Sequence, residues 1–304
     1  SQVAEAEAQV EPASTPEPDP VPSAEEKIIS ISNPIVERAV RESLNNLTGE
    51  LTETELTKVT LLGLNSTQIT DEGLKEVAKF QQLTVLGLGT TKITDAGLKE
   101  VAKLHKLEVL ILISSMITDA GLKEVAKLQK LTQLYLSSTE ITDAGLKEVA
   151  KLQNLAELSL YNTEITNEGL KEVAKLQKLT NLSLPTQITD AGLKEVAKLQ
   201  KLTNLNLYNN KITDAGLKHL AKLHQLNYIV LRDTQITDEG LKEVAKLQNL
   251  GMLDLRGTKV TDAGLKHLAK LKKLALLRLD NTKATALGVS ELEKALPNCG
   301  IIGP

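Results

Sequence analysis

Four histidines and one cysteine are the residues of this chain that could most readily bind a metal or act as a nucleophile. Such chemistry requires several groups converging at a fixed spacing. His105, His219, His224 and His267 have no cysteine or carboxylate at metal-ligand spacing, so we interpret them as solvated surface residues. Cys299 is interpreted as a small apolar residue in the cover of the chain's last part.

Motifs of enzymes are missing from the sequence as well. It contains no GxSxG, P-loop or HExxH pattern. Aspartates recur once in every repeated unit, at the start of an expected helix, where the positive helix end favours a carboxylate; this spacing differs from that of a calcium loop. The sequence therefore predicts no catalytic residues, no cofactor and no metal, and a protein that is not an enzyme.

Tyrosine and arginine are the chain's best candidates for binding chemistry, because both are enriched in the hot spots of protein interfaces. The chain has four tyrosines, no tryptophan and one phenylalanine. All the tyrosines and three arginines occupy matching slots of a repeated unit. These residues are Tyr135, Tyr161, Tyr208, Tyr228, Arg232, Arg256 and Arg278.

The unit that positions these residues recurs about ten times. The glycine of its motif ITDAGL stands at Gly73, Gly97, Gly121, Gly145, Gly169, Gly192, Gly216, Gly240, Gly264 and Gly288. Every spacing is 24 residues except one of 23, between Gly169 and Gly192. A fixed period of this length predicts a solenoid, since each unit can bury its apolar face only against its neighbours.

Each unit joins a segment of period two to a segment of helical period. In residues 83–104, Leu86 and Leu88 share one face of an expected short strand. The apolar residues of 98–102 share one face of an expected helix, for which Thr94 is the predicted N-cap. Stacked units should form a parallel sheet on one side and a row of short helices on the other.

The pattern LxxLxLxxTxITDAGLxxV resembles the leucine-rich-repeat family, specifically its 24-residue ITDxGL class, which is associated with bacterial proteins. The resemblance covers Val59 to about Leu296. It implies an α/β fold, a leucine-rich-repeat solenoid shaped as a horseshoe, with a parallel concave sheet and short convex helices. Many members carry Asn after the strand, where this chain mostly carries Thr, whose hydroxyl can still bond neighbouring backbone; Asn210 is an exception.

Variation between units is concentrated at strand positions expected to face outward on the concave side. The first three units are apolar there, the middle units carry Tyr, Ser and Asn, and the last units carry mixed charges. Ten strands at ~4.8 Å spacing span on the order of 45 Å, which suits a protein interface. The predicted partner-binding residues are Val109, Ile111, Ile113, Tyr135, Tyr161, Pro185, Tyr208, Tyr228, Arg232, Asp254, Arg256 and Arg278.

The 23-residue unit lacks one residue and holds a proline beside its strand, in the run Leu182-Ser-Leu184-Pro185-Thr186-Gln-Ile188. Because proline has no N–H to donate, we expect the sheet to be disturbed there. Tyr161, Pro185 and Tyr208 fall in one column and form a predicted contact strip for a partner. A tolerated deletion without function is the alternative.

The remaining segments define the domain organisation. Residues 1–27 are an acidic Pro/Glu/Ala-rich leader, expected to be disordered. Residues 28–58 are the predicted N-terminal helical cap, where Asn33-Pro34 and Thr52 to Glu55 carry helix-start signals. Residues 59–304 form the repeat domain, with a C-terminal cap at about 284–304. A spacer behind a removed signal peptide predicts export to the periplasm, the cell surface or the medium, with the cytoplasm left open.

Composition limits the classes of partner. The net charge of −3 argues against nucleic acid, and no run of 18 apolar residues could cross a membrane. We hypothesise a non-catalytic recognition module that binds a protein on the concave face. A glycan-binding protein and a self-associating structural scaffold are the alternatives.

Overall fold

The computed structural model of this chain describes residues 27–304. The predicted acidic leader at 1–27 therefore lies outside the described residues, apart from Lys27.

One parallel sheet of eleven strands runs through the described residues, and its strands follow one another in chain order. Consecutive strands pair without a register shift, so that Leu86 lies opposite Leu110 and Leu182 opposite Leu205. The strands are β1 (Leu61–Gly63), β2 (Val85–Gly87), β3 (Val109–Ile111), β4 (Gln133–Tyr135), β5 (Glu157–Ser159), β6 (Asn181–Ser183), β7 (Asn204–Asn206), β8 (Tyr228–Val230), β9 (Met252–Asp254), β10 (Leu276–Arg278) and β11 (Gly300–Ile302). The fold predicted from the repeat is confirmed, and β11 adds a strand beyond the ten units.

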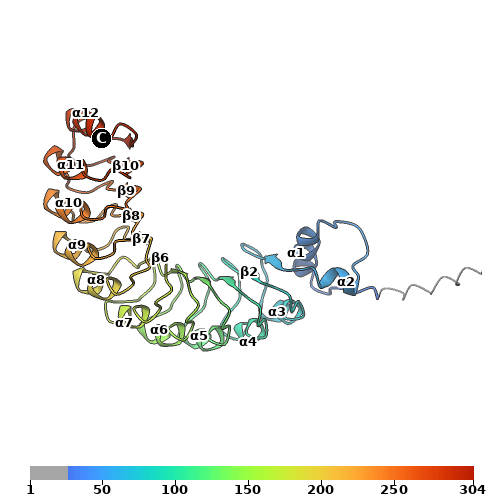
Figure 1. The fold of residues 1–304 in the computed structure, drawn as a ribbon. Coiled ribbons are helices and arrows are strands. Elements are labelled where there is room, and N and C mark those ends of the chain that lie inside the picture. The colour runs from blue at the N-terminus through green and yellow to red at the C-terminus, as the bar shows by residue number, and fades with distance from the viewer. Residues whose placement is uncertain (1–26) are drawn as a thin grey trace, which may run out of the picture.

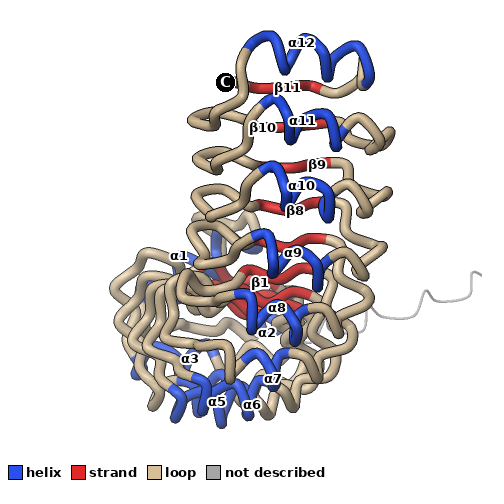
Figure 2. The backbone as a smooth tube through the Cα atoms, turned by 90° about the vertical axis from the view of Figure 1, so that its left-hand side faces the viewer, coloured by secondary structure: helices blue, strands red, loops and turns tan. Residues whose placement is uncertain are grey.

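Short helices lie on the opposite side of each unit. Figure 1 shows the strands along the inner side of a curved molecule and the helices along its outer side, and Figure 2 shows β8 to β11 stacked as successive rungs. The helices are α1 (Pro34–Leu44), α2 (Glu53–Leu56), α3 (Asp71–Val77), α4 (Leu98–Val101), α5 (Asp119–Val125), α6 (Asp143–Val149), α7 (Leu170–Val173), α8 (Asp190–Val196), α9 (Asp214–Leu220), α10 (Asp238–Val244), α11 (Asp262–Leu268) and α12 (Ala286–Ala295).

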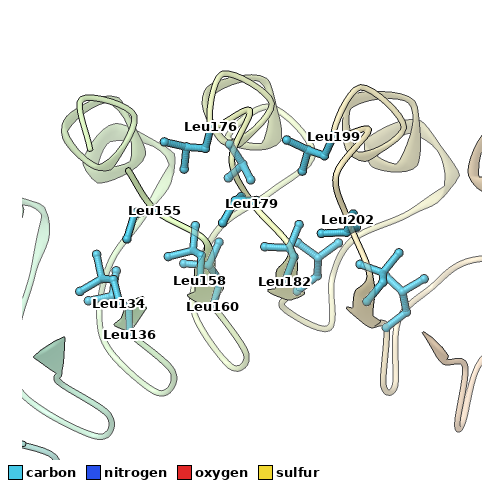
Figure 3. Close-up of a cluster of buried hydrophobic side chains, with 14 of the residues drawn as sticks. Leu134, Leu136, Leu155, Leu158, Leu160, Leu176, Leu179, Leu182, Leu199 and Leu202 are labelled. Carbon is cyan, nitrogen blue, oxygen red and sulfur yellow. The ribbon is translucent and has the colours of Figure 1, made fainter. Parts of the chain in front are cut away.

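Leucine fills the space between sheet and helices. Figure 3 shows Leu158, Leu160 and Leu182 from the strand side meeting Leu176 and Leu179 from the helix side. All five are at most 3% exposed. Their burial removes apolar surface from water, which stabilises the fold by roughly 25 cal/mol for each Å² of apolar surface buried. Because every unit shares its leucines with both neighbours, the units form one continuous core.

The motif ITDAGL couples neighbouring units through its threonine and aspartate. The Asp95 carboxylate accepts a hydrogen bond from the Thr118 N–H at 2.9 Å and another from the Thr118 hydroxyl at 2.6 Å, one unit further on. The same pair of bonds recurs at Asp71, Asp119, Asp143, Asp190, Asp214, Asp238 and Asp262. We call this contact the Asp–Thr bridge. It adds inter-unit hydrogen bonding to the helix-start role expected for these aspartates.

The glycine of the motif leaves room for the Asp–Thr bridge. A Cβ placed on Gly121 would overlap Asp95 Oδ1 of the preceding unit and come within 2.8 Å of Leu98 Cδ1. Gly145 meets Asp119 in the same way. The glycine is thus required for close packing between units.

Helix starts follow the sequence prediction in most units but not in all. Thr118 caps α5 and accepts from the Ala120 N–H at 3.3 Å. The prediction for Thr94 is wrong in detail, since α4 begins only at Leu98 with Gly97 in the capping position. Thr94 still accepts from the Ala96 N–H at 3.3 Å, so the local turn persists without a regular first helical turn.

Threonines after the strands close the turn as expected. Thr91 is buried, and its hydroxyl donates to the Leu88 carbonyl at 2.7 Å. Thr139 makes the equivalent bond to Leu136 at 2.6 Å. At Asn210 the amide nitrogen donates to the Tyr208 carbonyl at 3.3 Å, while its buried Oδ1 accepts no hydrogen bond from the described residues.

Both ends of the described solenoid are covered. Asn33 caps α1 and Thr52 forms a capping box with Glu55 at α2, as the sequence predicts. Helix α1 lies against β1 and α3. At the other end, α12 and β11 cover the last repeat, and burial raises the pKa of the Cys299 thiol there.

The 23-residue unit differs from the others in its turn. In regular units the second residue after the last strand leucine has a positive φ, for example Asn162 (54°) and Asn209 (55°). Its N–H continues the sheet, as in the 2.9 Å bond from Asn209 to the Arg232 carbonyl. Described residues 182–188 contain no positive φ, so the deleted residue is the one that adopts it.

The sheet is disturbed beside this unit, as predicted, but the missing donor is not the cause. In regular units the residue equivalent to Pro185 donates no hydrogen bond to the next strand. The N–H of Tyr208, for example, donates to Asn206 Oδ1 of its own unit at 2.9 Å. Among the described residues, Asn162 and Thr186 lack the onward bond that Asn209 makes. Figure 1 shows the molecule turning at β6, β7, α7 and α8. We call this turn the corner.

Candidate binding surface on the concave face

The predicted binding residues lie on one face of the sheet. They alternate with the buried leucines along each strand, so their side chains project away from the core. Tyr135 and Tyr228 stand on β4 and β8, while Tyr161 and Tyr208 directly follow β5 and β7. All four are half-buried, and neither the core nor the helical side contains a tyrosine.

Tyr161 and Tyr208 meet across the corner. Their ring centroids are 5.8 Å apart with planes 29° from parallel, although their strands are two units apart, ~10 Å at usual strand spacing. The guanidinium carbon of Arg232 lies 5.0 Å from the centre of the Tyr208 ring. Pro185, in the unit between the tyrosines, is buried. The predicted strip therefore presents two stacked rings and an arginine to solvent, and the proline lies beneath the surface.

The charged end of the face is largely paired within itself. Asp254 is only 3% exposed and holds Arg256 through bonds of 2.9 Å to Nε and 2.6 Å to Nη2. The hydrogen bond to this carboxylate, partly opposed by burial, raises the pKa of Arg256. Arg232 bonds the exposed Asp233 at 3.1 Å. Arg278 is half-buried and has no carboxylate within 4.0 Å in the described part of the chain.

The N-terminal end of the face is apolar. Val109, Ile111 and Ile113 are half-buried there. Leu61 on β1 is 49% exposed and Met116 is 52% exposed. This part of the sheet therefore offers apolar contact area and no charged group from the strands themselves.

A hollow of about 210 Å³ opens at the centre of the face, on the strands beside the corner. Tyr135 and Tyr228 stand at its two ends, and short polar side chains line it between them. These residues are Glu157, Ser159, Asn181, Ser183, Asn204 and Asn206, and Leu158, Leu182 and Leu205 contribute to its floor. We call it the central hollow.

Sequence reasoning missed the polar lining of the central hollow. Glu157, Asn181 and Asn204 occupy the slot before the central strand leucine, the same outward-facing slot from which Val109 and Tyr228 were predicted. A signal was present: Glu157 is the only acidic residue at that slot in the ten units. The hollow itself arises because Ser159 and Ser183 are short where Tyr135 is long.

Glu157 dominates the electrostatics of the central hollow. It is half-buried and lies beside two neutral polar groups: Asn181 Nδ2, which donates to it at 3.4 Å, and the Tyr135 hydroxyl. Within the described residues no Lys, Arg or His forms an ion pair with it. Burial, followed by the nearby Glu157 carboxylate, raises the pKa of Tyr135 to about 12. The Tyr135 hydroxyl donates to Gln133 Oε1 at 3.1 Å.

The described residues form neither a metal site nor a membrane-spanning helix. Residues 27–304 contain no group of three or more His, Cys, Asp or Glu arranged to hold a metal ion. His105 and His224 are exposed, and His219 and His267 are half-buried on α9 and α11. In the same residues no helix has both the length and the apolar character needed to cross a membrane.

Comparison with known proteins agrees with this architecture. A family model described as "Leucine Rich repeat" matches residues 55–78, 127–150, 198–221 and 222–245. A search of curated proteins found no match.

Two of the solved structures similar to this chain are bacterial proteins. A leucine-rich-repeat protein of Leptospira interrogans is 25% identical with a TM-score of 0.57, and the alignment covers 82% of this chain and 73% of that one. An internalin of Listeria monocytogenes is 20% identical with a TM-score of 0.51, covering 89% of this chain and 95% of that one. At this identity the likeness to the internalin shows the fold alone.

Proposed function

We propose that this chain, which is a leucine-rich-repeat protein, is a non-catalytic recognition module that binds a protein partner on its concave face. The fold supports protein interaction in general. The observation that carries the proposal is the placement of the tyrosines: all four lie on the inner sheet surface, and none on the convex side. Tyrosine supplies apolar contact area together with a polar tip, which suits interfaces.

The graded surface supports a macromolecular partner over a small ligand. Apolar residues at β1 to β3, stacked tyrosines at the corner and arginines at β8 to β10 follow one another along a sheet of eleven strands. At ~4.8 Å per strand the sheet is roughly 50 Å long, comparable with a standard protein interface. We propose that the partner spans the corner, where the stacked rings of Tyr161 and Tyr208 are already ordered before binding.

Affinity capture with matched variants tests the proposal. The purified chain, the concave variant Tyr161→Ala/Tyr208→Ala and the convex variant Glu124→Ala/Lys127→Ala would each capture proteins from extracts of the source organism and of cells it contacts. We expect a protein retained by the wild type and by the convex variant, with at least ~10-fold weaker binding to the concave variant, typical of hot-spot loss.

The concave variant needs a stability control because the two rings contact each other. Loss of their stacking should lower the free energy of unfolding by about 0.5–1.5 kcal/mol, which leaves most of the solenoid folded. Circular dichroism and thermal melts would establish this. Capture that survives in the folded concave variant, or that is lost in the convex variant, would contradict the proposal; dimerisation of the chain alone would favour the scaffold alternative.

We also propose that the module acts outside the cytoplasm, as the composition of segment 1–27 suggests. Cell fractionation of the source organism tests this. A chain found only in the cytoplasmic fraction would exclude it.

A further inference from the structure

The central hollow contains one ionisable carboxylate without a counter-charge. Glu157 is half-buried, lined by amides and hydroxyls, and the described residues give it no cation within 4.0 Å. Elsewhere on the face the buried carboxylate of Asp254 has its own arginine at 2.6 Å. The two acids thus differ: the charge of Asp254 is compensated within the chain, and that of Glu157 is left to solvent.

A partner that covers the concave face must displace the solvent around Glu157. Desolvating a carboxylate is strongly unfavourable unless an opposite charge and hydrogen bonds replace the solvent. An uncharged apolar side chain would bury Glu157 unpaired, and an acidic one would add repulsion. A basic side chain removes the penalty by forming a charge-assisted hydrogen bond.

The size and lining of the hollow favour one side chain over a larger ligand. About 210 Å³ is below the ~300–1,000 Å³ of ordinary small-molecule sites. Besides Glu157, the lining offers acceptor oxygens on Asn181, Asn204 and Ser183. A guanidinium group carries five N–H donors in one plane, whereas an ammonium carries three at a point. Tyr135 lines the hollow beside Glu157, and an aromatic ring attracts a planar cation.

A sugar ring fits the lining less well. Carbohydrate hydroxyls could bond the amides, but they carry no charge to compensate Glu157.

We propose that the central hollow is a specificity pocket that takes an arginine side chain of the protein partner, with Glu157 as its counter-ion. This inference rests on the proposed function, because it names the chemistry of the partner on the same face. It predicts that the bound segment of the partner carries an exposed arginine opposite the corner.

The chain's own tyrosines provide the readout. The protein has no tryptophan, and its four tyrosines all lie on the concave face, two of them at the ends of the hollow. Tyrosine fluorescence of the full chain therefore reports on this surface alone. The probes are the blocked peptides Ac-Gly-Gly-X-Gly-Gly-NH2, in which X is arginine, lysine or citrulline; citrulline has the shape of arginine without its charge.

We expect the arginine peptide to change the fluorescence at the lowest concentration, with about tenfold weaker binding of citrulline and an intermediate affinity for lysine. Raising the salt concentration should weaken the arginine peptide selectively. Glu157→Gln should reduce its affinity to the citrulline level. Glu164→Gln is the matched control, since Glu164 is exposed in the same unit and outside the hollow.

Equal affinities for arginine and citrulline, no binding of any peptide, or an unchanged affinity in Glu157→Gln would overturn the pocket. Binding of methyl glycosides with no response to the arginine peptide would assign the hollow to sugars instead. These outcomes are separate from the capture experiment: capture that depends on Tyr161 and Tyr208 without an arginine response removes this inference alone.

Discussion

Two acidic residues of the concave face illustrate how surroundings decide what a side chain can do. Asp254 is buried and held by Arg256 at 2.6 Å, so its charge is used within the fold. Glu157 lies beside neutral polar groups, Asn181 Nδ2 at 3.4 Å and the Tyr135 hydroxyl, and has no cation within 4.0 Å in the described residues. Asp254 stays a predicted binding residue. Because its carboxylate is buried and paired with Arg256, a partner would meet the arginine first.

Tyr135 should report the charge of Glu157 directly. Because burial and the Glu157 carboxylate disfavour the phenolate, the pKa of Tyr135 rises to about 12, against ~10 in the unfolded chain. The neutral Tyr135 hydroxyl therefore contributes to the stability of the fold; this contribution is fully present below pH ~10 and is lost as the pH rises through about 12. Glu157→Gln should lower the Tyr135 pKa while burial keeps it above 10.

Absorbance of the phenolate after a rapid pH jump, read before alkaline unfolding, measures this titration. The difference between the wild type and Tyr135→Phe isolates the single tyrosine. A Tyr135 midpoint near 10 in the wild type, or no shift in Glu157→Gln, would contradict the geometry of the hollow.

At the scale of the element, the repeated motif is explained by contacts between units. Asp119 receives both Thr142 bonds and lies where a Cβ of Gly145 would be. We therefore expect Gly145→Ala to destabilise the fold by about 1–3 kcal/mol through overpacking, even though alanine favours helices. Gly63→Ala, whose Cβ meets nothing within 4 Å, should change stability by less than ~0.5 kcal/mol.

Urea unfolding of the two variants measures these differences. The double variant Asp119→Ala/Gly145→Ala provides the internal check: its cost should be smaller than the sum of the single costs, because one substitution removes the clash made by the other. Additive costs would show that the glycine is required for another reason.

The two end caps depend on carboxylates, which makes them sensitive to acid. Burial alone would raise the pKa of Glu76, but hydrogen bonds from Ser32 and Asn33 outweigh it and lower the pKa. Glu76 accepts from the Ser32 N–H at 3.1 Å, ahead of α1. At the other end, Thr285 precedes α12, and the hydrogen bonds from its N–H and hydroxyl lower the pKa of Asp262 in the preceding unit.

Because both pKa values are depressed in the fold, the stability they contribute is present above the unfolded values, ~4, and is lost as the pH falls through the folded ones. The same Asp–Thr bridge precedes α5 and α9, but these helices are packed on a neighbouring helix at both sides. Hydrogen exchange, corrected for intrinsic rates, should therefore show α1 and α12 losing protection before α5 and α9 as the pH falls below ~4. Glu76→Gln should already show the loosened α1 at pH 7. Uniform loss along the chain would refute this order.

At the scale of the whole molecule, the sequence predicts the features that recur with the 24-residue period. It predicts few of the contacts between side chains of different units. Leucines at fixed slots predict the sheet, the core and the outward tyrosines, and Asn33-Pro34 predicts the start of α1. The 5.8 Å stacking of Tyr161 on Tyr208 depends on ring orientations over an intervening unit. The central hollow depends on Ser159 and Ser183 being short beside Tyr135, a comparison that one unit's pattern does not contain.

We infer that the corner depends in the same way on one absent residue, which can be restored. Inserting Asn between Pro185 and Thr186 returns the unit to 24 residues and supplies the left-handed position that Asn162 and Asn209 occupy in their units. The onward ladder bonds should then form on both sides of the unit, the molecule should straighten, and Tyr161 and Tyr208 should separate. We expect small-angle scattering to show a maximum dimension longer by ~5 Å or more, at least one strand spacing.

Pro185→Ala at unchanged length is the matched variant for this experiment. Since the N–H of that position makes no ladder bond in regular units, the substitution should leave the scattering curve as it is. A straightened Pro185→Ala chain would mean that the proline makes the corner, and an insertion variant with unaltered dimensions would mean that neither feature does. If the insertion straightens the chain and also abolishes binding of the arginine peptide, the missing residue is what shapes the concave face for its partner: one deletion bends the sheet, stacks the tyrosines and narrows the hollow that the short Ser159 and Ser183 leave open beside them.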